Sequence, residues 1–122
     1  CEAADEFSVD AGRAATRRLL CRTEPDGLLC ANDLLAAGAI GALRAAGYEI
    51  PDHIAVVGMD NSELAGITWP PLSSVDLGSE ERARRAVELL MDRIEQPARP
   101  TERIHVEARL VVRASSSAEV LA

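Results

Sequence analysis

The stretch from Asp26 to Asp60 most constrains what this chain can fold into, because it has the pattern of a strand–helix–strand unit. Gly27–Ala31 is an apolar run with the length of a buried strand. Leu34–Ala46 is helical and is expected to end at Gly47, since glycine suits the left-handed position after a helix. Ile54–Gly58 is a second buried strand. Two strands joined by a helix lie parallel with a right-handed crossover, so the pattern predicts an α/β fold with a parallel sheet.

Polar residues follow both predicted strands. Asn32 and Asp33 come after the first strand, and Asp60 comes after the second. Ligands of open parallel sheets bind at the carboxyl ends of the strands, so Asn32 and Asp60 indicate a site for a polar ligand. Each also has a structural alternative. A helix cap needs only one of Asn32 and Asp33, and Asp60 could simply begin a turn with Asn61 and Ser62.

The helix Leu34–Ala46 carries one charge, Arg44, among thirteen residues. A helix that is apolar nearly all round needs a second surface against it. Gly38, Gly41 and the many alanines would permit another backbone to approach closely. The alternative is an alanine-rich helix that is only loosely covered. We favour an interface with another subunit.

Three sequence runs, in this order and spacing, carry a resemblance to a known family. They are AND-x-x-A-x-G-A-x-x-A-L-x-x-x-G-x-x-x-P-x-x-x-x-V-V-G-x-D-N, then WPPLSSV, and finally LVVRASS. The chain resembles the effector-binding domain of LacI-type bacterial transcription regulators from about Phe7 to Ser116. The resemblance implies a Rossmann-like lobe of the periplasmic-binding-protein-like fold. Periplasmic sugar-binding proteins share this fold and are the alternative.

The resemblance also implies three effector-binding residues. Phe7 would pack its ring on the effector, although a single phenylalanine could equally plug the helix onto the sheet as core. Asn32 would hold an effector hydroxyl, while Asp33 caps the helix. Asp60 would accept hydrogen bonds from adjacent hydroxyls, a role that suits a carboxylate.

In the family, the helix that corresponds to Leu34–Ala46 lies in the dimer interface. Trp69 precedes two prolines and is either a core residue or an interface anchor. The expected interface residues of a homodimer are therefore Leu34, Ala37, Gly38, Ile40, Gly41 and Trp69.

The predicted strands are too few for a complete doubly wound domain, whose sheets have about five or six on average. By resemblance, residues 1–76 form most of the second lobe, and residues 77–100 form a helix that packs on the first lobe. Within that segment Ser79 is expected to cap a helix to Glu95, with the apolar stripe Ala83, Val87, Leu90 and Ile94. Residues 101–122 hold two return strands, 104–107 and 110–113, and a loose tail. The first lobe and the DNA-binding head of the family are absent from these residues.

Charge and composition limit the function classes. The net charge of −7 argues against DNA binding by this segment, because phosphate contacts need clustered Lys and Arg. Three cysteines without metal-ligand spacing favour free thiols in a reducing cytosol, and no apolar run is long enough for a membrane span. No GxGxxG, P-loop or nucleophile elbow indicates an enzyme, a cofactor or a metal. The expected function is the cytoplasmic, sugar-sensing and dimerising part of a repressor that meets operator DNA only through a separate head.

Overall fold

A four-stranded sheet forms the centre of the molecule, and the computed structural model describes residues 1–117. The strands lie in the order β1-β2-β3-β4, with β1 parallel to β2 and β2 parallel to β3. Only β4 is antiparallel to its neighbour. The predicted parallel strand–helix–strand unit is therefore confirmed. The bounds are β1 Gly27–Leu29, β2 Ala55–Met59, β3 Ser73–Asp76 and β4 Arg109–Val111.

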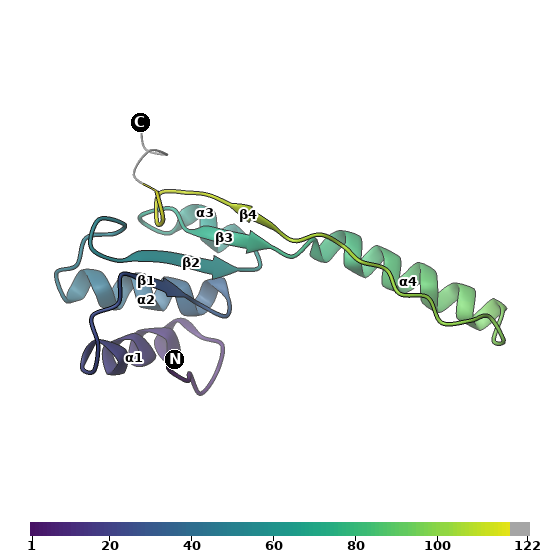
Figure 1. Ribbon diagram of the computed structural model, residues 1–122, viewed down its shortest axis with the longest axis horizontal. Coiled ribbons are helices and arrows are strands. Elements are labelled where there is room, and N and C mark those ends of the chain that lie inside the picture. Colours follow the sequence, from purple (N-terminus) through teal and green to yellow (C-terminus); the bar gives the residue numbers. More distant parts are fainter. Residues whose placement is uncertain (118–122) are drawn as a thin grey trace.

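Three helices accompany the sheet: α1 Val9–Leu20, α2 Asp33–Ala45 and the short α3 Glu63–Ile67. Helix α2 packs against β2, and α1 packs against α2 (Figure 1). The two long helices approach closely at two glycines. A Cβ atom on Gly12 would lie 2.3 Å from the Leu35 carbonyl oxygen, and one on Gly38 would lie 2.0 Å from the Val9 carbonyl oxygen. The close approach that the glycines of α2 permit is thus made by α1 of the same chain.

The core lies between α2 and the sheet and is wholly aliphatic. Its buried members come from α2, from β2 and the residue before it, from α3, and from the loop before β3. Half-buried Leu20, Leu28 and Tyr48 pack around them. Burial of such side chains from water is the main favourable term in folding. The buried residues are Ala36, Ile40, Leu43, Ile54, Val56, Ala65 and Leu72.

Helix ends follow the sequence in some places and depart from it in others. Ser8 caps α1 by accepting a hydrogen bond from the Ala11 amide at 3.1 Å. Gly47 is left-handed with φ 85°, as predicted. The predicted cap of the helix Ser79–Glu95 is wrong. Gly78, with φ 63°, occupies that position and Ser79 is the first helical residue. A left-handed turn directs the chain out of β3 there, and glycine adopts it without strain.

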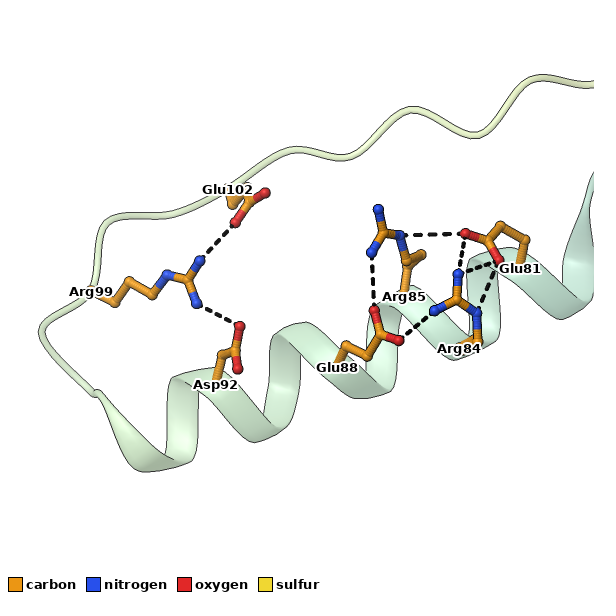
Figure 2. Close-up of polar contacts among 7 residues, drawn as sticks. All are labelled: Glu81, Arg84, Arg85, Glu88, Asp92, Arg99 and Glu102. Carbon is orange, nitrogen blue, oxygen red and sulfur yellow. Dashed lines mark hydrogen bonds and ion pairs between the residues drawn. The ribbon is translucent and has the colours of Figure 1, made fainter.

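Helix α4, Ser79–Glu95, extends away from the sheet, and residues 97–108 return along it (Figure 1). Arg99 anchors the return through ion pairs with Asp92 at 2.5 Å and Glu102 at 3.2 Å, while Glu81 and Glu88 pair with arginines along the helix (Figure 2). No residue of α4 is buried, and its apolar stripe is exposed. The return strand predicted at 104–107 is not formed, and the pairing is confined to β4.

Residues 114–117 are not the loose tail that the sequence indicated. Ala114 and Ser115 are buried between the amino ends of β2 and β3. The Ser115 hydroxyl donates to the Val56 carbonyl at 2.5 Å and accepts from the Ser73 amide at 2.8 Å. The turn therefore closes the sheet by satisfying backbone groups that would otherwise be buried without partners. Residues 118–122, the rest of the predicted tail, lie outside the described residues.

Candidate ligand-binding site

Asp60 lies directly after β2, at the carboxyl edge of the parallel strands, and is exposed. Its φ of 101° is outside the regions that non-glycine residues normally adopt, and Asn61 follows with φ 48°. The Asp60 amide donates to the Val75 carbonyl at 2.9 Å, whereas its carboxylate makes no hydrogen bond or ion pair to any residue from 1 to 117. Strained backbone that presents a free carboxylate is typical of a binding site.

Asn32 lies at the same edge. Leu29 pairs with Val57, and Asn32 and Asp60 each come three residues later, so the two follow the strands in register. The Asn32 side-chain oxygen accepts from the Leu35 amide at 2.9 Å, and Asn32 is therefore the cap of α2. Its side-chain NH₂ group has no partner within the described part of the chain. The assignment of the cap to Asp33 is wrong, because the Asn32 side chain makes the capping hydrogen bond and the Asp33 side chain points elsewhere.

The Asp33 side chain is only 2% exposed and points into the loop after β2. Its carboxylate accepts hydrogen bonds from the Ser74 hydroxyl at 2.6 Å, the Ser62 amide at 2.7 Å and the Ser62 hydroxyl at 2.8 Å. Sequence reasoning missed this role. The available signal was that a cap needs one polar residue where this chain has two.

Asn61 links the loop after β2 to the end of β3 and to the segment just after β4. Its side-chain oxygen accepts from the Arg113 guanidinium at 2.7 Å, and its NH₂ group donates to Asp76 at 3.4 Å. The Gly78 amide at 2.9 Å, and then the Arg109 guanidinium at 3.2 Å, hold the pKa of the Asp76 carboxyl below its ordinary value. Both contacts favour the charged form.

Phe7 is 69% exposed, so the alternative that it is a core residue is wrong for this chain. It lines an open groove of about 530 Å³ together with Cys30, Ala31 and Leu35, which places it beside the end of β1. Asp60 does not line that groove. Burial raises the pKa of the Cys30 thiol to about 11, so this cysteine is a protonated, inert part of the groove.

The predicted interface residues separate into two groups. Ile40 is 4% exposed in the core and Gly38 lies against α1, so neither is on the surface and both are removed from the predicted interface. Ile40 faces the sheet as part of the core, and Gly38 is covered by α1, which packs on the face of α2 that looked unpartnered. Leu34 and Trp69 are exposed and Ala37 and Gly41 half-buried, and Trp69 is therefore not a core plug.

Residues 1–117 contain neither a metal-binding cluster nor a membrane-spanning helix. Within this range no group of three His, Cys, Asp or Glu side chains is placed to hold a metal ion. None of the helices there combines the length and the apolar character that crossing a bilayer requires.

The sequence pattern of the family described as periplasmic binding protein-like domain matches residues 2–116. This chain belongs to that family. It is 34% identical over 113 residues to the HTH-type transcriptional regulator GalR of Lacticaseibacillus casei, with 90% of this chain and 34% of that protein covered. It is 39% identical over 111 residues to the regulator CelR of Thermobifida fusca, with 90% and 33% covered.

Solved structures give the same assignment. A transcriptional regulator CelR–cellobiose complex matches with a TM-score of 0.86 and 38% identity, covering 91% of this chain and 34% of that one. A LacI family regulator from Arthrobacter sp. FB24 in complex with lactose matches with a TM-score of 0.84 and 37% identity, covering 95% and 45%. The periplasmic-binding-protein-like domain is thus the effector-binding part of LacI-type regulators, as the sequence indicated. The chain spans about a third of the length of the curated relatives it matches, which are regulators and not enzymes.

Proposed function

We propose that this chain is the sugar-sensing part of a LacI-type bacterial transcription regulator, a repressor. One observation carries the proposal beyond family membership. Asp60 projects a free, exposed carboxylate from strained backbone at the carboxyl edge of the sheet, in register with Asn32. A carboxylate that accepts two hydrogen bonds suits the adjacent hydroxyls of a sugar.

Asn32 and Phe7 complete the proposed site. The unpaired NH₂ group of Asn32 donates to a sugar oxygen while its carbonyl oxygen caps α2. The exposed Phe7 ring supplies an apolar face for the ring of the sugar. The cellobiose and lactose complexes among the structural neighbours support a sugar as the ligand class.

The wider regulator supplies the remaining parts. Operator DNA is bound through a separate N-terminal head, since this chain has a net charge of −7. Helix α4 packs its exposed stripe on the other lobe of the same effector domain. A homodimer forms over Leu34, Ala37, Gly41 and Trp69 in the cytoplasm. The alternative of a periplasmic sugar-binding protein is not favoured, because the relatives named above are transcription regulators.

The mechanism is a shift between two arrangements of the lobes. A sugar held between them stabilises the closed arrangement. It changes operator affinity only as far as it binds one arrangement better than the other. One side of this sugar site is formed by Asp60, Asn32 and Phe7.

Calorimetric titration of the two-lobed regulator with cellobiose, lactose and a panel of other mono- and disaccharides tests the proposal. For the sugar that binds, Asp60→Ala should cost on the order of 1.5–3 kcal/mol, the scale for losing hydrogen bonds to a charged group. Asn32→Ala should cost about 1 kcal/mol, part of it from the lost cap. Asp52→Ala is the matched control, because Asp52 is an exposed aspartate before the opposite end of β2. An Asp60→Ala protein that folds and binds as tightly as the control refutes the assignment.

A further inference from the structure

We propose that Asp33 is a positioning residue of the ligand site. Its buried carboxylate holds residues 60–62 in the conformation that presents the Asp60 side chain. The inference rests on the proposed function, because it requires Asp60 to contact the sugar.

The Asp33 carboxylate is buried. An ionised carboxylate is tolerated in a protein interior only when its oxygens accept hydrogen bonds. Asp33, at 2% exposure, accepts two from Ser62 and one from Ser74. Its place in the first turn of α2 also favours a negative charge. The side chain thereby ties the start of α2 to β3 and to the loop after β2.

The loop after β2, residues 60–62, has an unusual backbone conformation. Asp60 and Asn61 both have positive φ, a state that persists only where the surroundings hold it. The Asn61 amide donates to the Ser74 hydroxyl oxygen at 3.0 Å, and that hydroxyl donates in turn to Asp33. Ser62, the next residue, binds Asp33 directly. Asp33 therefore holds the loop at its end and, through Ser74, at its middle.

The Asp33 carboxylate lies in a confined space next to Gly58. A Cβ atom on Gly58 would lie 2.4 Å from an Asp33 carboxylate oxygen, so the side chain rests directly on the backbone of β2. A longer acid such as glutamate would have to displace its carboxylate from this position beside Gly58 and the two serines. The position is therefore specific for the length of aspartate as well as for its charge.

Asp33→Asn is the informative substitution, because it keeps the size of the side chain. An amide offers a single acceptor oxygen and no charge. In one orientation its NH₂ group faces the Ser62 amide, which is also a donor, and in the other the Ser74 hydroxyl loses the oxygen to which it donates. In both orientations at least one hydrogen bond accepted by the carboxylate is lost, and those that remain no longer go to a charge. Val56→Ala is the matched control, since Val56 is a buried core residue whose backbone hydrogen-bonds to Ser115 and not to the loop.

Amide hydrogen exchange of the 122-residue chain is the first test. Asp33→Asn should speed exchange at residues 60–62 about tenfold relative to the rest of the sheet, the scale of one lost hydrogen bond to a charge. Val56→Ala should raise exchange without favouring this loop. Equal behaviour of the two variants overturns the proposal.

A double-mutant cycle on sugar affinity in the two-lobed regulator is the second test, with cellobiose and lactose as probes. Asp33→Asn should weaken binding about tenfold in the parent. It should have little further effect once Asp60→Ala is present, because the two act through one contact. Additive losses overturn the proposal, since a merely destabilising change would add.

Two further outcomes are decisive. If Asp60→Ala leaves sugar affinity unchanged, the proposed sugar contact fails, and the positioning role, which requires it, fails with it. The loop-selective exchange would then show only that Asp33 orders the loop. If Asp33→Asn does not fold, Ser62→Ala takes its place, because it removes one hydroxyl bond to Asp33 and keeps the amide bond. About threefold weaker binding, absent in the Asp60→Ala background, supports the role, and unchanged affinity refutes it.

Discussion

Replacing Gly38 by alanine should destabilise the fold even though alanine is the better helix former. The gain in helix propensity is about 1 kcal/mol. Against it, the new Cβ atom would lie 2.0 Å from the Val9 carbonyl oxygen and 2.7 Å from the Arg13 amide nitrogen. Both are backbone atoms, so α1 and α2 must separate, and overpacking of this kind costs about 1–3 kcal/mol or more. Because both clashes are with backbone atoms, the cost lies at the upper end of this range, and the balance is a net loss of about 2 kcal/mol.

Gly41→Ala is the matched control, because it lies one turn later in the same helix. Its nearest neighbours are guanidinium atoms of Arg13 at 3.8 Å, an ordinary contact distance. Gly41→Ala should therefore be neutral or stabilising by up to about 1 kcal/mol. Urea unfolding followed by circular dichroism gives both values, with stability read from the midpoint at unchanged slope. A Gly38→Ala protein as stable as Gly41→Ala would refute the close approach of the two helices.

Two further predictions concern ionisable groups. Cys1 and Cys21 are exposed, whereas burial raises the pKa of Cys30 to about 11. A thiolate-directed reagent near pH 8 should modify two thiols rapidly and the third only after unfolding, and rapid labelling of all three would contradict the burial. Asp76 has a folded pKa below its unfolded value of about 3.8, so its contribution is present above that pH and is lost as pH falls through the lower folded pKa. Asp76→Asn should thus lower the urea midpoint near neutral pH but not in strong acid, and a pH-independent difference would contradict the linkage.

The sequence predicted the parts of the fold that local chemistry decides. Periodicity and glycine placement located α2, β1 and β2 within about two residues, because apolar runs and caps act over one or two turns. The packing of α1 on α2 was not predictable in this way. The glycines on α2 showed that some backbone would approach, but not which one, and the nearest candidate was taken to be another subunit.

The candidate site likewise has features that local sequence predicts and features that depend on residues distant in the sequence. Asn32 and Asp60 follow from the rule that parallel strands end at one edge. The position of the Asp33 side chain, by contrast, depends on hydrogen bonds from Ser62 and Ser74. Both serines are distant from Asp33 in the sequence and come near it only in the folded sheet. The same applies to Ser115, whose partners lie in β2 and before β3, so a serine-rich run was mistaken for an unstructured end.

The turn at Ser115 also means that β2 and β3 are synthesised well before the residues that complete their hydrogen bonds. Its hydroxyl binds the carbonyl of Val56, which is made 59 residues earlier. At about 5–20 residues per second, β2 is made on the order of 3–12 s before Ser115. During that interval the amino ends of β2 and β3 are open edges that can pair with another nascent chain. Sheet closure in this lobe therefore waits until the segment after β4 has been synthesised, and the exposed period lengthens whenever translation slows over α4.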